Sequence, residues 1–347
     1  MTQILELKTK HQNHSPFHDF DLFAQKNGLE AYRKINWSEQ FMVVFPEENP
    51  LLKHPELQSL GNLYHLDTPY PLASRKFKNR DTVIQVGDEE IGGGVFNLVA
   101  GPCAVESEMQ MDETAAMLAE KGVKWMRGGA FKPRTSPYSF QGLGRKGLEI
   151  FKLMAEKYKI KVVTEVIDFD VLEEVEAYAD ILQVGARNMH NYYFLKKLGQ
   201  STKPVLLKRG MCATIKEWLL AAEYILSHGN ENVILCERGV RTFDDAVRNQ
   251  MDIPAIALIK QLSHIPIWAD PSQGTGRRNL ITPLSLAAIA AGADGLMVEV
   301  HPKPEKARSD GAQSITFDDF ELLSKSLHPM LETVGKSLES KGLSLNV

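Results

Sequence analysis

Short runs of apolar and β-branched residues recur from about residue 96 to residue 300, with polar loops and longer helical patterns between them. Such runs are typical of strands buried on both faces of a parallel sheet. The expected strands are Phe96–Ala100, Lys124–Arg127, Lys161–Val166, Ile181–Val184, Pro204–Lys208, Val233–Cys236, Pro266–Ala269 and Gly295–Val300. The helical patterns between them include Met109–Lys121, Gly147–Tyr158, Asp170–Ala179, Ile215–Ser227 and Pro283–Ala291.

Eight strands that alternate with helices over about 230 residues predict a (β/α)8 TIM barrel, a fold of the α/β class. A doubly wound open sheet is the alternative, but it would more often hold about five to seven strands and carry an early glycine fingerprint. The triplet Gly92–Gly94 precedes a strand and does not join a strand to a helix, so it is typical of a hairpin turn. We expect a hairpin over Thr82–Val95 to close the bottom of the barrel.

The first 75 residues follow a different order of elements, which predicts a small βαββαβ domain of the ferredoxin-like type. Its expected elements are strand Ile4–Leu7, helix Phe17–Asn27, strands Leu29–Asn36 and Glu39–Phe45, helix Pro50–Leu60 and strand Asn62–Leu66. The stretch Asp67–Lys78 contains Pro69 and Pro71 and is the expected linker. The predicted domains are therefore residues 1–75 and the barrel at residues 76–347.

Composition narrows the class of function. The chain has 347 residues, of which 43% are hydrophobic and 24% charged, and its formal net charge is −4. A mildly acidic chain predicts no nucleic-acid partner. No apolar run approaches the ~18 residues that a membrane span needs, and the N-terminus lacks a signal-peptide pattern. The three cysteines, Cys103, Cys212 and Cys236, have no paired spacing, which predicts a reducing cytoplasm.

Positively charged residues recur where the expected strands end. In a TIM barrel, catalytic groups lie at this carboxyl face. The cations at or just after strand ends are Arg127, Lys132, Arg134, Arg187, Lys208 and Arg238. One alone would be interpreted as a solvated loop residue, but cations crowded in one cavity repel unless an anion neutralises them. The pattern predicts a pocket for a phosphate, or a phosphate with a carboxylate, both of which arginine binds well.

A thiol and two carboxylates form a second group. Cys103 follows the first expected strand, while Glu299 and Asp310 follow the eighth, and these two strands are neighbours in a closed barrel. A mixed sulfur and oxygen set suits a divalent transition metal such as Mn, Fe, Co or Zn. The alternative interpretation is that Cys103 is a small buried side chain that packs like an apolar residue.

Six ordered segments resemble those of 3-deoxy-D-arabino-heptulosonate 7-phosphate (DAHP) synthases of the type I beta branch. The segments are GPCAVES at Gly101–Ser107, RGGAFKPRTSPYSFQGLG at Arg127–Gly144, QVGARN at Gln183–Asn188, LLKRG at Leu206–Gly210, LCERGVRTF at Leu235–Phe243 and EVHPKPEKARSDGAQS at Glu299–Ser314. The resemblance covers about residues 70 to 330. The KPRTS segment argues against the sister family that makes 3-deoxy-D-manno-octulosonate 8-phosphate.

The resemblance implies condensation of phosphoenolpyruvate with erythrose 4-phosphate, with release of phosphate, as the first step of the shikimate pathway. It implies Cys103, Lys132 and Glu165 as catalytic residues, with Glu165 near the reacting carbon and the attacking water. It further implies that phosphoenolpyruvate is held by Arg127, Lys132, Arg187, Lys208 and Arg238. The phosphate of the aldose would be held by Arg134 and Thr135.

One position departs from the family pattern. The family's seventh strand normally leads into Asp-Pro-Ser-His, whose histidine binds the metal, whereas this chain has Asp270-Pro271-Ser272-Gln273. The expected ligands are therefore Cys103, Glu299, Asp310 and, in place of histidine, Gln273, with Mn2+ ahead of Fe2+, Co2+ or Zn2+. An amide oxygen is a weaker ligand than imidazole, so we expect weakened metal affinity with activity retained at high metal.

Three alternatives remain open at this position: a shift of metal choice towards Mn or Mg, a catalytically impaired copy, and substitution by His301 at a neighbouring strand end. His264 precedes the seventh strand and is expected to face the opposite end of the barrel. An impaired copy would be a sensor of phosphorylated metabolites. A related 2-keto-3-deoxy sugar-phosphate synthase is the other alternative function.

The N-terminal domain resembles an extension through which some members of this branch undergo feedback inhibition by aromatic amino acids. The resemblance thus implies an aromatic amino acid as effector, and it suggests a homotetramer. The alternative is a passive piece that serves only oligomerisation.

Overall fold

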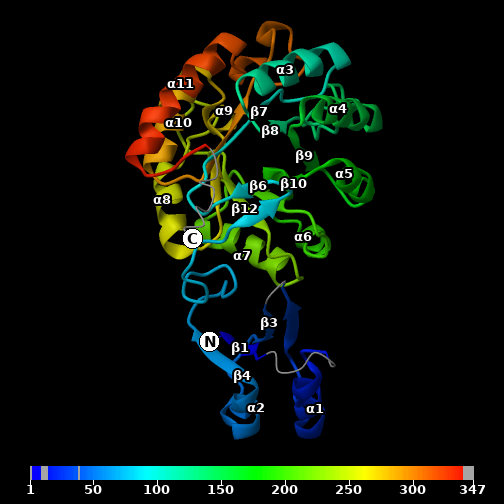
Figure 1. Ribbon diagram of the computed structural model, residues 1–347, viewed down its shortest axis with the longest axis vertical. Helices are drawn as coiled ribbons and strands as arrows, with labels where there is room; N and C mark the ends of the chain where they lie inside the picture. Colours follow the sequence, from blue (N-terminus) through cyan, green and yellow to red (C-terminus); the bar gives the residue numbers. More distant parts are fainter. Residues whose placement is uncertain (1, 9–14, 38–39, 339–347) are drawn as a thin grey trace, which may run out of the picture.

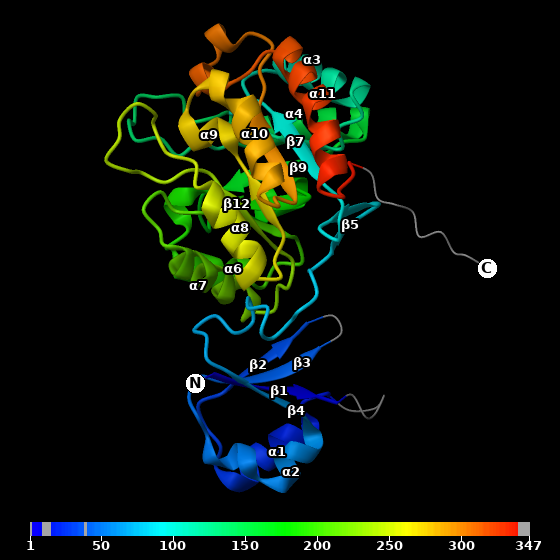
Figure 2. The ribbon, with the colours of Figure 1, turned by 90° about the vertical axis from the view of Figure 1, so that its left-hand side faces the viewer.

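The computed structural model describes residues 2–8, 15–37 and 40–338. Residues 1 and 347, at the ends of the predicted domains, and Glu39, the predicted start of a strand, lie outside this part. Figures 1 and 2 show a small domain below a larger barrel. None of the helices described is long and apolar enough to cross a membrane.

The small domain is a four-stranded antiparallel sheet with strand order β2-β3-β1-β4, which confirms the ferredoxin-like prediction. Its elements are β1 (Thr2–Leu7), α1 (His18–Asn27), β2 (Arg33–Asn36), β3 (Phe41–Phe45), the 3-10 helix η1 (Pro50–Lys53), α2 (Pro55–Leu60) and β4 (Gly61–Leu66). Helices α1 and α2 cover the face of the sheet that lies away from the barrel (Figure 2). On that face Phe20 and Phe23 pack against Leu5, Val43 and Phe45.

Two predicted elements of this domain differ from the structure. The strand expected from Leu29 begins only at Arg33, because Gly28 and Ala31 have φ near +60° and turn the chain after α1. The helix predicted from Pro50 to Leu60 is split in two. His54 has extended backbone (φ −69°, ψ 128°), since a residue before proline disfavours the helical region.

The second part is a closed parallel barrel, as predicted. Its strands are β7 (Asn97–Gly101), β8 (Trp125–Arg127), β9 (Lys161–Val166), β10 (Ile181–Val184), β11 (Val205–Lys208), β12 (Val233–Glu237), β13 (Ile267–Ala269) and β14 (Gly295–Glu299). Its helices are α3 (Glu108–Glu120), α4 (Arg145–Tyr158), α5 (Leu172–Tyr178), α6 (Tyr192–Leu198), α7 (Ile215–Leu226), α8 (Ile253–Leu262), α9 (Pro271–Thr275), α10 (Ile281–Ala290) and α11 (Phe317–Thr333), with short 3-10 helices η2 (Ala186–Asn188), η3 (Arg278–Leu280), η4 (Pro304–Lys306) and η5 (Gly311–Gln313).

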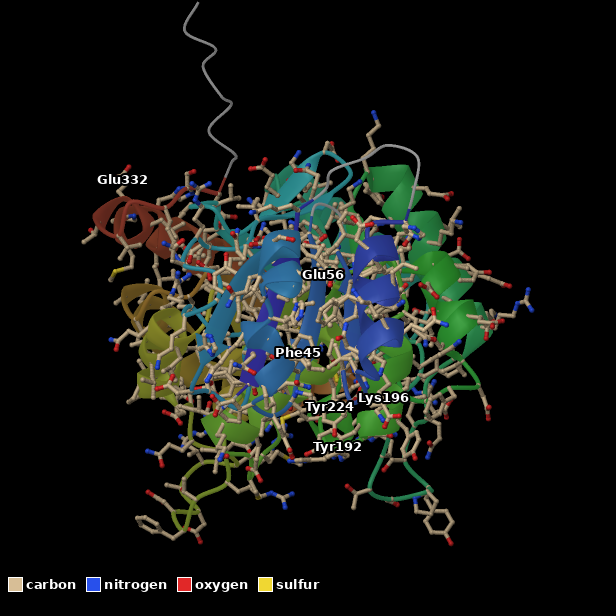
Figure 3. The ribbon with its side chains drawn as sticks, turned by 90° about the horizontal axis from the view of Figure 1, so that it is seen from below. Phe45, Glu56, Tyr192, Lys196, Tyr224 and Glu332 are labelled. Carbon is tan, nitrogen blue, oxygen red and sulfur yellow. The ribbon has the colours of Figure 1, made fainter. Side chains whose placement is uncertain are left out.

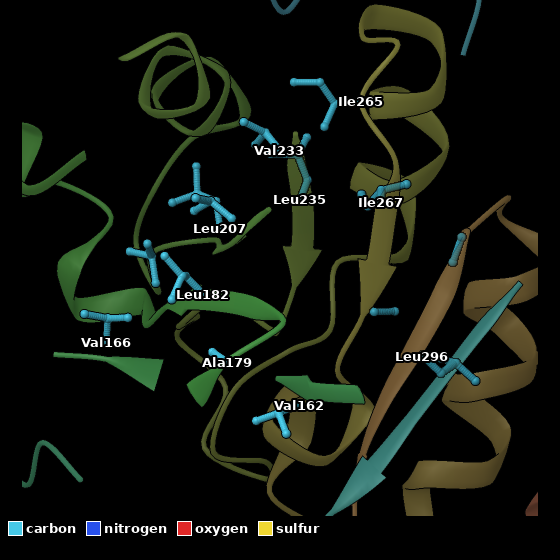
Figure 4. Close-up of a cluster of buried hydrophobic side chains, with 14 of the residues drawn as sticks. Val162, Val166, Ala179, Leu182, Leu207, Val233, Leu235, Ile265, Ile267 and Leu296 are labelled. Carbon is cyan, nitrogen blue, oxygen red and sulfur yellow. The ribbon is translucent and has the colours of Figure 1, made fainter. Parts of the chain in front are cut away.

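Strand side chains alternate between two apolar clusters. Leu182, Leu207 and Leu235 point outwards, into the layer beneath the helices (Figure 4). Their neighbours Ile181, Leu206 and Ile234 belong to a separate cluster inside the barrel. Both faces of each strand are therefore buried, which explains why the strands read as continuous apolar runs.

A hairpin plugs the amino-terminal end of the barrel. It consists of β5 (Ile84–Val86) and β6 (Glu89–Ile91). Its residues Ile84, Val86 and Ile91 join the interior cluster that includes Trp125 and Trp268. The prediction for this hairpin is confirmed, and the carboxyl end of the barrel is left for a polar site.

The small domain contacts the barrel through α7 and the linker. Trp37 Nε1 donates to the Leu226 carbonyl at 3.2 Å. The carboxylate of Glu223 accepts hydrogen bonds from the backbone N–H groups of Leu72 (3.0 Å) and Ala73 (2.9 Å). Figure 3 views this side from below, where Tyr192 of α6 and Tyr224 of α7 stack with ring centroids 4.6 Å apart. The domain boundary between residues 75 and 76 stays a prediction.

His264 also lies at this lower end. Its Nε2 is 2.7 Å from the Leu72 carbonyl and its Nδ1 is 2.7 Å from Thr82 Oγ1. Burial lowers the pKa of His264 to about 4, so the ring is neutral at pH 7. As expected from its position before β13, His264 is far from the carboxyl face.

Candidate active site

A cavity of about 460 Å³ opens at the carboxyl ends of the barrel strands. The predicted site residues that line it are Arg127, Lys132, Arg134, Thr135, Glu165, Arg187, Lys208, Arg238, Gln273 and Asp310. The long loops after β8 and β12 flank it and project on the same side of the barrel (Figure 2). The structure thus brings the cations from separate strand ends into one pocket.

Arg127, at the end of β8, is fixed by two oxygen atoms. Its Nη1 donates to the Pro102 carbonyl at 2.9 Å and lies 3.2 Å from Glu299 Oε1. Burial alone would lower the pKa of Arg127, but Glu299, Cys103 and Asp270 together outweigh it and raise that pKa. Its buried Nε has no hydrogen-bond partner within the described chain and is available to a ligand.

Lys208, at the end of β11, forms a buried ion pair with Asp270. Asp270 also caps α9, because its Oδ1 accepts a hydrogen bond from Gln273 N at 2.9 Å. Burial would raise the pKa of Asp270, but Lys208 and Arg127 lower it below the usual range. Asp270 therefore stays ionised and holds the Lys208 ammonium at the pocket wall.

Lys132 folds back over the first strand end, where its Nζ donates to the Cys103 carbonyl at 3.1 Å. The side chain passes close over Gly129, since a Cβ there would lie 2.6 Å from Lys132 Cδ and would displace the lysine. Burial acts to lower the pKa of Lys132, but the acidic groups of Cys103, Glu165 and Glu299 together outweigh it and raise that pKa. The ammonium is thus charged at neutral pH and able to give up a proton.

Glu165, on β9, reaches the pocket because Gly185, just after the neighbouring strand β10, has no side chain. A Cβ on Gly185, after β10, would lie only 2.0 Å from Glu165 Oε1. The glycine in the QVGARN segment therefore makes room for the carboxylate. Arg187, two residues further on η2, is exposed and lines the same pocket.

The thiol and carboxylates predicted as metal ligands lie together. The ligand atoms of Cys103, Glu299 and Asp310 are all within 4.8 Å of one another, and Cys103 Sγ is 3.2 Å from Asp310 Oδ2. Burial, followed by the Glu299 charge, raises the pKa of Cys103 to about 11. Asp310 has φ +53°, an uncommon backbone conformation for a residue other than glycine. This group fits one divalent cation, whose charge would offset the three clustered acidic groups.

Gln273 directs its amide nitrogen, and not its oxygen, towards this group. Its Nε2 donates to Glu299 Oε1 at 3.0 Å and to Asp310 Oδ2 at 3.2 Å. Its Oε1 accepts from Arg238 Nη2 at 2.8 Å and from Arg248 Nη2. This assignment follows from the network, because the reverse orientation would set the amide NH2 against two guanidinium groups.

His301 is not in the group. Its Nδ1 accepts a hydrogen bond from Lys303 N at 3.0 Å, and its Nε2 lies 3.5 Å from Glu106 Oε2. Nδ1 is therefore occupied, Nε2 has no hydrogen-bond partner within the described residues, and His301 is not part of the group formed by Cys103, Glu299 and Asp310.

Sequence reasoning missed several residues of this site. Arg241 and Arg248 line the pocket from the loop after β12, and Arg248 Nη1 lies 3.6 Å from Asp310 Oδ1. Ser309 lies 3.2 Å from Cys103 Sγ, and Gln313 Nε2 donates to Glu299 Oε2 at 2.7 Å. Arg241 belongs to the LCERGVRTF segment, so the resemblance could have indicated it, although it lies in the loop beyond the end of β12.

A closed (β/α)8 barrel with a cationic cavity at its carboxyl face, beside a thiol and two carboxylates, defines an enzyme that handles small phosphorylated compounds. The chain belongs to the DAHP synthetase I family, whose family model matches residues 76–334. This confirms the family that the six segments predict, and with it an aldol-type condensing enzyme. The family is generally metal dependent.

Two relatives show how specific the match is. The chain is 53% identical over 283 residues to phospho-2-dehydro-3-deoxyheptonate aldolase of Thermotoga maritima. The alignment covers 82% of this chain and 84% of that protein. It is 33% identical over 248 residues to 2-dehydro-3-deoxyphosphooctonate aldolase of Francisella tularensis subsp. holarctica, with 67% of this chain and 90% of that protein covered.

Solved structures support the same family. The crystal structure of phospho-2-dehydro-3-deoxyheptonate aldolase (DAHP synthase) from Thermotoga maritima aligns with a TM-score of 0.77 at 45% identity, covering 97% of this chain and 99% of that chain. A truncated form of 3-deoxy-D-arabino-heptulosonate 7-phosphate synthase from the same organism aligns with a TM-score of 0.73 at 50% identity, covering 77% of this chain and 98% of that chain.

Proposed function

We propose that the protein condenses phosphoenolpyruvate with D-erythrose 4-phosphate and water to give DAHP and inorganic phosphate. The observation that carries the proposal is the single cavity lined by Arg127, Lys132, Arg187, Lys208 and Arg238. These cations suit the phosphate and carboxylate of phosphoenolpyruvate. Arg134 and Thr135, at the outer part of the same loop, suit the phosphate of the aldose.

The bond changes follow from the chemistry of the two reactants. Carbon 3 of the enol attacks the aldehyde carbon, and carbon 2 becomes electron-poor and takes up water, after which phosphate leaves. Lys132, charged and donating to the nearby Cys103 carbonyl, is placed to give a proton to the developing alkoxide. Glu165, on the neighbouring strand β9, lines the same pocket and is placed to take a proton from the attacking water.

The pocket also brings together two anions that repel each other. Fixed ammonium and guanidinium groups offset this repulsion, and holding the reactants side by side removes much of the entropic cost of a bimolecular step. The ion pairs Lys208–Asp270 and Arg127–Glu299 hold two of the cations in place before substrate binds.

For the metal we propose three protein ligands: Cys103, Glu299 and Asp310. A divalent ion held there would act as a Lewis acid that polarises the aldehyde oxygen. Gln273 is left out of the ligand set because its amide oxygen is directed to Arg238 and Arg248. With one side-chain ligand fewer than the family pattern, we propose weak binding, with Mn2+ ahead of Fe2+, Co2+ and Zn2+.

The test is a product assay on the purified protein. With phosphoenolpyruvate, erythrose 4-phosphate and excess Mn2+, we expect DAHP to form, and a five-carbon aldose phosphate to compete poorly. Binding of phosphoenolpyruvate without any turnover would instead support a metabolite sensor. A preference for the five-carbon sugar would support a related 2-keto-3-deoxy sugar-phosphate synthase.

We further propose that residues 1–75 form a regulatory domain that responds to an aromatic amino acid, in a homotetramer located in the cytoplasm. The alignment with the full-length Thermotoga structure over 97% of this chain supports a shared small domain. The solved structure of a truncated form of the Thermotoga maritima synthase covers 77% of this chain, so a form of this chain limited to the barrel can be tested. Inhibition by tyrosine or phenylalanine that disappears on deletion would support control, whereas an uninhibited full-length protein would favour a passive oligomerisation role.

A further inference from the structure

Two loops at the carboxyl face, the loop after β8 and the loop after β14, are fastened to each other by side chains. The guanidinium carbon of Arg308 lies 3.7 Å from the centroid of the Phe140 ring. Next to this stack, Arg134 Nη1 donates a hydrogen bond to Ser309 Oγ. Each loop thus contributes one residue to each contact.

The two loops have different tasks in the proposed function. The loop after β8 carries Arg134 and Thr135, which suit the phosphate of the aldose. The loop after β14 carries Asp310, one of the three proposed metal ligands. Buried Ser309 contacts residues of both sites. Its Oγ accepts a hydrogen bond from Arg134 of the aldose-phosphate site and lies 3.2 Å from Sγ of Cys103, a proposed metal ligand.

The loop after β14 is the better anchored of the two. Arg308 N donates to Glu106 Oε1 at 2.8 Å, and Arg278 Nη2 donates to the Gly311 carbonyl at 2.9 Å. In the loop after β8, by contrast, residues 135–138 are exposed to solvent. The base of that loop is closed by the hydrogen bond from Lys132 N to the Gln141 carbonyl (2.9 Å), whereas the stack and the Arg134 hydrogen bond join its outer part to the loop after β14.

We propose that the Phe140–Arg308 stack and the Arg134–Ser309 hydrogen bond couple metal binding to aldose-phosphate binding, so that each ligand tightens the binding of the other. The proposal rests on the function proposed above and adds to it. It assigns positioning roles to Phe140, Arg308 and Ser309, which no family resemblance indicated.

The coupling is expected to be positive, because one ligand orders side chains that the other ligand binds. A metal ion held by Cys103 and Asp310 would order Ser309, which precedes Asp310 in the chain and lies 3.2 Å from Cys103 Sγ, and Ser309 would in turn order the Arg134 guanidinium. Guanidinium has five N–H donors, so Arg134 can bind a phosphate while its Nη1 stays on Ser309. The phosphate would then bind an arginine that is already ordered, so less conformational entropy is lost on binding. Because the coupling free energy is the same in both directions, sugar-phosphate binding would tighten metal binding by the same factor.

The experiment measures Mn2+ binding by calorimetry, with and without erythrose 4-phosphate, in the absence of phosphoenolpyruvate so that no turnover occurs. We expect the sugar phosphate to lower the Mn2+ dissociation constant of the parent protein by about fivefold or more. In Phe140→Leu and in Arg308→Leu we expect this change to fall below about twofold. The matched control is Tyr138→Leu, since Tyr138 lies on the same loop but is 96% exposed.

Some Mn2+ also binds the sugar phosphate in solution. This contribution is the same for all variants, so comparison with the control separates it from binding to the protein. Equal tightening in Phe140→Leu, Arg308→Leu and the control would overturn the proposal, as would a parent protein whose Mn2+ affinity does not respond to the sugar phosphate or that binds no Mn2+. Circular dichroism melting of each variant shows whether it is folded, and Arg308, which is exposed, is the variant least able to disturb folding. DAHP synthesis by a protein without this coupling would leave the proposed function intact.

Discussion

The amide nitrogen of Gln273 lies 3.0 Å from Glu299 Oε1, while its amide oxygen accepts a hydrogen bond from Arg238 at 2.8 Å. One side chain thus joins a proposed metal ligand to a cation proposed to bind phosphoenolpyruvate. A histidine at this position could bind the metal, but it could not at once accept from Arg238 and donate to two carboxylates. The substitution therefore exchanges a metal ligand for a hydrogen-bonded bridge.

Gln273→His is expected to tighten Mn2+ binding by about tenfold or more, or about 1.4 kcal/mol, because it adds an imidazole to three existing ligands. The measurement is a calorimetric titration with Mn2+. Gln141→His is the matched control, since exposed Gln141 lies on a pocket-flanking loop away from the ligands. Equal affinity in the parent protein and Gln273→His would mean that Gln273 does not limit metal binding.

Lys132→Met is expected to lower kcat by roughly 100-fold or more, the usual effect of losing a general acid. Because the acidic neighbours outweigh burial and raise the pKa of Lys132, activity should not fall with deprotonation of this lysine in the neutral and mildly alkaline range. A pH–rate profile of kcat checks both points. Lys146→Met, at an exposed site on α4, is the control. A Lys132→Met enzyme with nearly normal kcat would rule out the acid role.

Arg187→Ala is expected to raise the KM for phosphoenolpyruvate by roughly 10- to 100-fold, since a charge-assisted hydrogen bond contributes about 1.5–3 kcal/mol. Arg187 is exposed in the empty pocket, so the variant should fold normally. Arg145→Ala, another exposed arginine, which pairs with Glu149 on α4, serves for comparison. An unchanged KM in steady-state kinetics would remove Arg187 from the substrate site.

Glu223, which holds the linker by two backbone N–H groups, should make stability depend on pH. Burial raises the pKa of Glu223 to about 8, although the hydrogen bonds from Leu72 and Ala73 act to lower it. The unfolded carboxyl titrates near its ordinary value of about 4.3, so between that pH and about 8 the folded protein binds more protons. The free energy of unfolding should therefore fall as the pH rises through this window, by up to a few kcal/mol.

Glu223→Gln removes this titration, and the melting temperature of the variant relative to the parent should rise between pH 5 and pH 9. The control is Glu332→Gln at an exposed position on α11 (Figure 3). A constant difference between Glu223→Gln and the parent across that range would show that Glu223 is ionised in the folded protein throughout.

The sequence predicted the barrel well because its strands are buried on both faces and therefore read as continuous apolar runs, as Val233–Cys236 does. It also placed the strand-end cations in one pocket, since strand ends of a closed parallel barrel must meet. It did not predict the orientation of Gln273, which depends on Arg248 from a loop 25 residues away. Nor did it predict the contact of Phe140 with Arg308, because loop conformations are set by tertiary packing and not by local pattern.

The most direct test of the account is phosphate release from phosphoenolpyruvate and erythrose 4-phosphate by protein treated with a chelator and then supplied with increasing Mn2+. The account predicts little release without metal, and a rise that saturates only at Mn2+ concentrations well above those that saturate Gln273→His. Full activity in chelator, or no activity at any Mn2+ concentration, would contradict it.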